Sequence, residues 1–170
     1  MDIMNTPKLL VSVDNLRPEG LDLALDLDPE RLKALVTSEG QPSPAIVSPM
    51  TGSLKVSRNG DRLMLKGFFE VTAEIPCDRC LSETRAILSG RIDEVLELAI
   101  PGQIIEENDE NDGGLEVVDG RVDLTELLSE FFWLAWPFRF ICREDCAGLC
   151  SRCGADLNHG LCGCREHDWN

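Results

Sequence analysis

The sequence lacks any apolar run close to the roughly 20 residues that a membrane-spanning helix needs, so a membrane location is not expected. Residues 1–10 have neither a basic start nor a long apolar core. We therefore expect no secretory signal and a cytoplasmic location. The sequence also lacks an HExxH pattern, a glycine-rich phosphate loop and a nucleophile with an identifiable base. These absences predict that the protein is not an enzyme and has no small-molecule substrate.

Basic residues are scarce as well. The chain has 16 Lys and Arg residues against 31 Asp and Glu residues, which gives a formal net charge of −15 at pH 7. Because binding to a phosphate backbone is driven mainly by Lys and Arg, this balance opposes nonspecific binding to RNA. It favours a basic protein as the partner, although acidity that only keeps the chain soluble explains the composition equally well.

The first third of the chain carries local signals for a strand and a helix. Four leucines in Leu21–Leu27 alternate with Asp and Ala, a period of two that predicts a half-buried strand. Asp28 and Pro29 then form an N-cap with proline at the first helical position, which predicts a short helix near 29–38. A short strand is expected over Lys8–Val13, and the proline- and serine-rich segment 40–49 is expected to be a loop.

The middle of the chain is β-rich. Asn59-Gly60, the strongest short hairpin signal, joins two expected strands, 53–57 and 62–76. A third long strand is expected over 84–100, with Cys77-Asp-Arg-Cys80 in the turn before it. A short strand is expected over 115–118. The acidic segment 106–114 reads as a loop without the ligand spacing of a calcium site.

A second helix is expected after the capping box Asp123-Leu-Thr-Glu126, and it should end before Pro137. We interpret its aromatic residues as core packing rather than as a ligand-binding patch. The fold class predicted from these elements is α+β: an antiparallel β-rich domain with two short helices, residues 1–141, followed by a C-terminal zinc-binding module, residues 142–170.

Cysteine is abundant, with eight residues in the chain. A cytosolic location argues against disulfides, which leaves metal ligation or redox chemistry. The last six cysteines fall within a glycine-rich segment that has too little apolar content to fold by burial alone, and metal binding could supply its stability. The candidate ligands are Cys77, Cys80, Cys142, Cys146, Cys150, Cys153, Cys162 and Cys164.

Eight thiols divide naturally into two closed, four-coordinate sites, so we expect two structural zinc ions. The four cysteines from Cys150 to Cys164 form a local set, and Cys77, Cys80, Cys142 and Cys146 form a set that links distant segments. Redox activity of Cys77 and Cys80 and an iron–sulfur cluster remain alternatives. His159 and His167 could substitute as ligands.

Three motifs stand in a characteristic order and spacing: Ile75-Pro-Cys-Asp-Arg-Cys-Leu81, Asp123-Leu-Thr-Glu-Leu-Leu128, and the tail Cys142-x3-Cys146-Ala-Gly-Leu-Cys150-x2-Cys153-Gly-Ala-Asp-Leu-Asn158. Together they resemble the motifs of the YceD family. The resemblance covers roughly residues 45–164. Family members are bacterial and plastid proteins implicated in accumulation of large-subunit ribosomal RNA, and their genes commonly neighbour that of the basic ribosomal protein L32.

The resemblance implies a non-enzymatic ribosome-biogenesis factor that supports accumulation of large-subunit (23S) ribosomal RNA. From the charge balance we expect it to bind a basic ribosomal protein such as L32, with any ribosomal RNA contact confined to Arg79 and Arg152 beside the cysteines. The alternative function is a cytosolic thiol redox or metal-handling protein with labile zinc.

Overall fold

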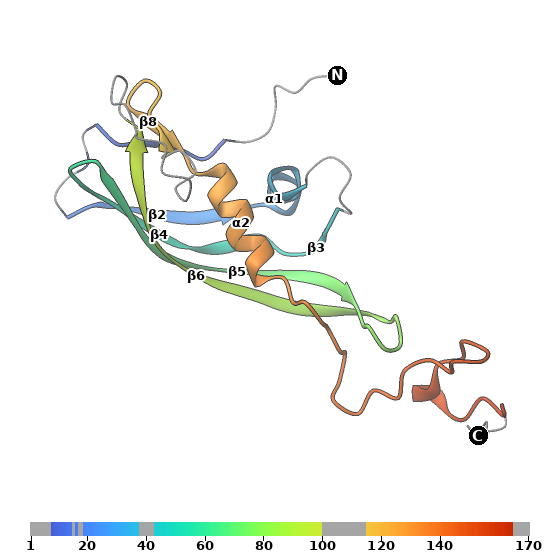
Figure 1. The fold of residues 1–170 in the computed structure, drawn as a ribbon. Helices are drawn as coiled ribbons and strands as arrows, with labels where there is room; N and C mark the ends of the chain where they lie inside the picture. The colour runs from blue at the N-terminus through green and yellow to red at the C-terminus, as the bar shows by residue number, and fades with distance from the viewer. Residues whose placement is uncertain (1–7, 15, 17–18, 38–42, 100–114, 165–170) are drawn as a thin grey trace.

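The computed structural model describes residues 8–14, 16, 19–37, 43–99 and 115–164 (Figure 1). Within these residues the fold is α+β, built on a six-stranded sheet in the order β2-β4-β5-β6-β7, with β3 paired to β5, and a separate two-stranded sheet, β1-β8. The elements are β1 (Leu10–Ser12), β2 (Leu21–Leu27), α1 (Pro29–Val36), β3 (Ala45–Ile46), β4 (Met50–Asn59), β5 (Arg62–Pro76), β6 (Glu83–Ala99), β7 (Leu115–Glu116), β8 (Arg121–Asp123), α2 (Thr125–Ala135) and the 3-10 helix η1 (Leu157–His159).

The antiparallel hairpin β5–β6 is formed by the two longest strands of the sheet, of 15 and 17 residues. Its register runs from Arg62 opposite Glu97 to Pro76 opposite Glu83, so the two strands remain paired up to the turn that contains the first two cysteines. Figure 1 shows this hairpin reaching away from the helices towards the C-terminal segment. The predicted hairpins at Asn59-Gly60 and at Cys77-Asp-Arg-Cys80 are both confirmed.

Three local predictions differ from the structure. The expected loop 40–49 contains β3, whose two residues pair with Glu74 and Ala73 of β5. β7 pairs with β6 in parallel, although the other ladders are antiparallel. Helix α2 begins at Thr125 with Leu124 as its N-cap, so Asp123 is not the N-cap. The Asp123 carboxylate still accepts from the amide of Thr125, the first helical residue, at 3.0 Å. The segment 106–114 lies outside the described residues.

The two helices cover one face of the sheet (Figure 1). Alternation along β5 and β6 places one set of side chains in the core, including the fully buried Leu65 and Phe69, and the other set on the opposite, uncovered face. Gly90 on β6 has no Cβ, and the ring of Phe69 occupies that space: a Cβ there would lie 2.5 Å from Phe69 Cε1.

The aromatic residues of α2 are packing residues, as predicted. Phe132 is buried and contacts Trp133 and Trp136 at ring-centroid distances of 5.3 and 5.8 Å. Trp133 also donates its indole N–H to the carbonyl of Val36, the last residue of α1, at 3.0 Å. Within the described residues, neither helix has the length and apolar character needed to cross a membrane.

Candidate metal centre

The eight cysteines gather into two groups of four in the structure. One, which we call the hairpin group, consists of Cys77, Cys80, Cys142 and Cys146. The other, the tail group, consists of Cys150, Cys153, Cys162 and Cys164. Within each group all four sulfurs lie within 4.8 Å of one another, the arrangement that could hold a metal ion. These are the two sets expected from the spacing, including Cys142 and Cys146 with their wider gap.

The hairpin turn presents the first two sulfurs of the hairpin group. The Leu81 amide donates to the Cys77 carbonyl at 2.8 Å, and the Cys77 amide donates to the Ser82 carbonyl at 3.0 Å. These bonds close the turn at the end of the β5–β6 ladder. Cys77 and Cys80 are both buried at this turn, 0% and 6% exposed, where they pack with Cys146, Ile141 and Leu149.

The chain leaving α2 supplies the other two sulfurs. Asp78 and Phe140 exchange two hydrogen bonds, which dock residues 138–142 against the turn. The Arg79 side chain donates to the Cys146 carbonyl at 3.0 Å, and the Arg79 carbonyl accepts from the Leu149 amide at the same distance. Two segments more than 60 residues apart in sequence are thereby held with their sulfurs converging.

The sulfur separations suit a tetrahedral ion. Cys77 Sγ lies 3.9 Å from Cys146 Sγ, and Cys80 Sγ lies 3.7 Å from Cys142 Sγ. A tetrahedral zinc site with Zn–S bonds of about 2.3 Å separates its sulfurs by about 3.8 Å. Disulfide-bonded sulfurs lie about 2.05 Å apart, and the structure has all eight cysteines free. The donor set and its spacing therefore fit a structural zinc ion.

Hydrogen-bond donors surround the sulfurs of the hairpin group. The backbone amides of Arg79 and Cys142 both donate to Cys77 Sγ at 3.4 Å. The Ser82 hydroxyl lies 3.0 Å from Cys80 Sγ. N–H and O–H donors of this kind stabilise thiolate ligands and orient them towards a metal. Ser82 and Asp78 are functional candidates that motif spacing alone does not reveal.

The ionisation of the hairpin group is uneven. Hydrogen bonding, chiefly from the Cys142 amide, lowers the pKa of Cys77 from 9.0 to about 6. Hydrogen bonding from Ser82 lowers the pKa of Cys80. Burial, reinforced by the neighbouring thiols, raises the pKa of Cys142 to about 12. Closely spaced sulfurs cannot all become anionic without a cation among them, and a bound metal ion removes that restriction.

In the tail group, too, one thiol has a lowered pKa and another a raised pKa, although its cysteines are less buried. Hydrogen bonding from the Cys153 amide lowers the pKa of Cys150 to about 6, and the neighbouring Cys153 side chain raises the pKa of Cys164 to about 12. Cys153 is exposed and the other three cysteines are half-buried. Gly148 precedes this group with φ +75°, and a Cβ there would lie 3.1 Å from the Arg79 carbonyl oxygen, so the turn favours glycine.

The structure locates three of the other four candidate residues, and partner binding by Arg79 and Arg152 stays a prediction. Arg79 lies at the hairpin group, but its side chain contacts the Cys146 carbonyl, which gives it a structural role whatever else it binds. Arg152 is exposed between Cys150 and Cys153. His159 pairs with Asp156 at 3.1 Å and belongs to neither cysteine group. His167 lies outside the described residues.

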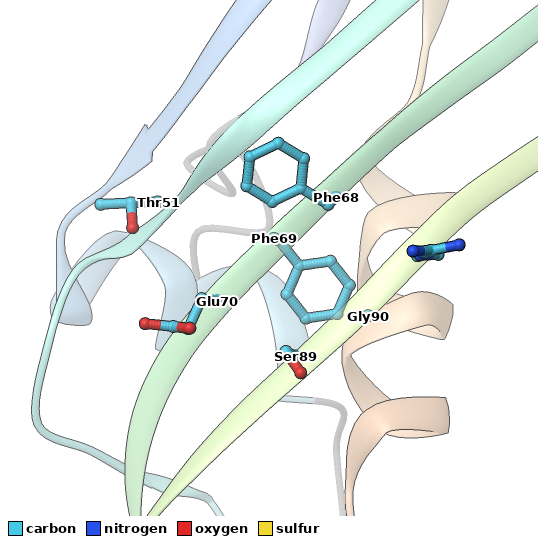
Figure 2. A pocket seen from close by; sticks show the side chains of 7 residues that line it. Thr51, Phe68, Phe69, Glu70, Ser89 and Gly90 are labelled. Carbon is cyan, nitrogen blue, oxygen red and sulfur yellow. The ribbon is translucent and has the colours of Figure 1, made fainter.

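A separate surface depression of about 380 Å³ lies on the sheet (Figure 2). Phe68, Glu70 and Ser89 line it, together with Thr51, Phe69, Gly90 and Arg91. Phe68 is 56% exposed there. The lining contains no cysteine or histidine, so the depression adds no metal ligands to the two groups.

A single family model spans both cysteine groups. The family model for large ribosomal RNA subunit accumulation protein YceD matches residues 65–170. This chain belongs to the YceD family. The matched region includes β5 from Leu65 onwards, β6, helix α2 and all eight cysteines, which agrees with the resemblance seen in the motifs.

Individual relatives extend the match. An uncharacterized protein of Mycobacterium tuberculosis is 32% identical over 104 residues, covering 61% of this chain and 49% of the relative. A maize protein named large ribosomal RNA subunit accumulation protein YCED homolog 1, chloroplastic, is 24% identical over 147 residues, covering 71% of this chain and 50% of the relative. The chain thus spans about half the length of the curated relatives it matches. No solved structure matches it.

Proposed function

We propose that this protein is a non-enzymatic, cytoplasmic factor in the accumulation of large-subunit (23S) ribosomal RNA, in which each cysteine group holds a structural zinc ion. The family description supports the role in ribosomal RNA accumulation. In the hairpin group four sulfurs converge within 4.8 Å, with two pairs at 3.7 and 3.9 Å and amide and hydroxyl donors around them, which supports the metal assignment. Closed sites of four thiolates leave no open position for a reacting water, which fits a structural role.

Elemental analysis of the purified chain tests the zinc assignment. We expect about two zinc ions per chain, because each closed site binds one ion. The double variant Cys162→Ser/Cys164→Ser should retain about one zinc ion, held by the hairpin group. A folded protein without metal would contradict the assignment, and visible charge-transfer absorption would redirect it to iron.

The charge of the protein supports a basic protein partner. Four-thiolate zinc centres each add negative charge to a chain whose formal net charge is already −15. Edge strand β2 presents two exposed carboxylates, Asp22 and Asp26. We propose that the acidic body binds a basic large-subunit ribosomal protein such as L32, and that RNA contacts are confined to Arg79 and Arg152.

Titration of the zinc-loaded protein against purified L32 and against naked ribosomal RNA fragments, at physiological salt, tests the partner. We expect binding to L32 that weakens as salt is added, because exposed charges are screened. Asp22→Lys/Asp26→Lys should weaken it, and Lys66→Ala, which removes a basic residue of the sheet, should not. Micromolar binding to RNA with none to L32 would overturn the proposal.

The arginines need their own control. Arg79→Ala/Arg152→Ala should reduce any RNA binding, whereas Arg91→Ala, which removes an arginine from β6, should leave it unchanged. Because Arg79 contacts the Cys146 carbonyl, zinc content is measured on each variant before its affinity is interpreted. RNA binding that persists in the double variant would show that these arginines are not the contact.

The alternative, a thiol redox or metal-handling protein, is favoured by the lowered pKa of Cys150 in a half-buried position. It predicts zinc that leaves under mild oxidant or chelator with disulfide formation. Burial of Cys77, the other thiol whose pKa falls to about 6, argues against it, because reactive cysteines are partly exposed. Zinc retention under these conditions decides between the two functions.

A further inference from the structure

Asn158 connects the two cysteine groups. It belongs to η1, in the segment between Cys153 and Cys162 of the tail group. Its side chain nevertheless lies against the hairpin group, where Nδ2 donates to Cys146 Sγ at 3.5 Å. Within the described residues, this hydrogen bond runs from inside the tail-group segment to a hairpin-group sulfur.

The orientation of the Asn158 amide follows from its neighbours. Oδ1 accepts from the Ala147 amide and from Arg143 Nη2, both at 2.9 Å. Nδ2 donates to Asp156 Oδ1 at 2.7 Å as well as to Cys146 Sγ. Rotating the amide by 180° would set its NH₂ group against two donors and its oxygen against two acceptors, so only the observed orientation satisfies all four contacts.

The position of Asn158 depends on the fold of the tail. The Leu157 amide donates to the Gly148 carbonyl at 2.9 Å, and Leu149 forms a β-bridge with Asp156. Between residues 147 and 164 the one buried residue is Gly148. A segment with so little burial takes its order mainly from cross-linking of its cysteines by a metal ion.

We propose that Asn158 is a positioning residue that couples the two metal centres: metal in the tail group orders η1, and the Asn158 amide then stabilises the Cys146 thiolate in the hairpin group. The inference rests on the proposed metal binding. Removing a hydrogen-bond partner of a metal ligand commonly weakens metal affinity 10- to 100-fold. Because coupling between binding sites is reciprocal, metal in the hairpin group also strengthens binding in the tail group.

Cadmium-113 NMR on the full chain tests the coupling, because each four-thiolate site gives its own resonance. Competition with a chelator, followed on each resonance, yields the metal affinity of each group separately. We expect Asn158→Ala to weaken the hairpin group about 10-fold. Cys162→Ser/Cys164→Ser, which disables the tail group, should weaken the hairpin group by a similar factor.

The combination of these variants gives the decisive result. If the tail group acts through Asn158, adding Asn158→Ala to Cys162→Ser/Cys164→Ser causes no further loss at the hairpin group. If the triple variant instead loses hairpin-group affinity by the product of the two separate factors, the coupling is overturned. An unchanged hairpin-group affinity in Asn158→Ala would overturn it as well. His159→Ala is the matched control, since it removes the adjacent, exposed side chain and should leave the hairpin group unaffected.

A second variant and the cadmium spectrum of the wild-type chain distinguish failure of the coupling from failure of metal binding. Asn158→Asp has nearly the same shape and loses the Nδ2 donor, so it should also weaken the hairpin group if Asn158→Ala fails to fold. Absence of both cadmium resonances from the wild-type chain would refute metal binding itself. Two cadmium resonances, with site affinities that do not change when Asn158 is substituted, would refute the coupling and leave the zinc assignment intact.

Discussion

Asp78 and Phe140 hold each other through two hydrogen bonds across 62 residues of sequence. The Asp78 amide donates to the Phe140 carbonyl at 2.9 Å, and the Phe140 amide donates to Asp78 Oδ2 at 2.7 Å. The first bond uses backbone atoms alone, whereas the second depends on the carboxylate. This exchange places the chain that carries Cys142 and Cys146 against the hairpin turn, so the hairpin group depends on a residue that is not a ligand.

We therefore expect Asp78→Ala to lower the free energy of unfolding by about 1 kcal/mol, the usual net contribution of one hydrogen bond. It should also speed the release of zinc to a chelator, because the segment at Phe140 is less firmly held. Denaturant unfolding and stopped-flow zinc release measure the two effects. Asp78→Asn keeps an acceptor oxygen and should behave more like the wild type; equal effects of both variants would show that the side-chain bond is unimportant.

Substitution of a ligand cysteine should disorder a different part of the chain in each group. Cys77→Ser should loosen the hairpin turn and the chain after α2 together, because the hairpin group joins segments that are distant in sequence. Cys150→Ser should disorder mainly residues 147–164, because the tail group is local. Amide hydrogen exchange, read segment by segment, separates the two patterns. Global unfolding by both variants to the same extent would contradict the division into two groups.

Much of the fold follows from local sequence signals. Asn59-Gly60 and the leucine alternation of Leu21–Leu27 predict β4, β5 and β2, because turn chemistry and a period of two are properties of neighbouring residues. The two cysteine groups follow from ligand spacing and from the preference of zinc for four ligands. The division of the chain at residue 142 into domain and module stays a prediction.

The contacts that support the site were not predictable in this way. The exchange between Asp78 and Phe140 and the Asn158 contact with Cys146 join residues that carry no periodic pattern and meet only after the hairpin and tail have docked. The parallel pairing of β7 with β6 is likewise a tertiary contact that no local sequence pattern specifies. The capping-box motif misplaced the start of α2 by one residue, because the Asp123 carboxylate accepts from the Thr125 amide in a turn that precedes the helix.

Trp133 ties the two helices together. Its indole N–H donates to the Val36 carbonyl, which lies at the end of α1 and has no further turn of helix to pair with. Trp133→Phe keeps most of the apolar contact and loses this bond, so we expect the free energy of unfolding to fall by about 1 kcal/mol. Trp136→Phe is the control for lost ring size, since Trp136 packs on Phe132 in the same cluster. Equal losses in both would assign the effect to packing.

Leu81 is the most unfavourable backbone position at the hairpin group. It has φ of 59°, the left-handed region that costs a residue with a Cβ about 1 kcal/mol or more, and its side chain is 64% exposed. The amide of Leu81 still donates to the Cys77 carbonyl at 2.8 Å, and this bond holds the turn in place. The strain is thus a consequence of presenting Cys77 and Cys80 from a tight turn.

Leu81→Asn should therefore raise the free energy of unfolding of the zinc-loaded protein by about 0.5 kcal/mol, because asparagine adopts the left-handed region more readily and little packing is lost. Leu81→Val should lower it by about 1 kcal/mol, since a β-branched residue is poorly tolerated there. Denaturant unfolding in excess zinc measures both. Stability that is the same in the two variants would show that the turn relaxes to accommodate them. If Leu81→Asn also weakens binding to the proposed partner, L32, the exposed leucine side chain contributes to that proposed interface.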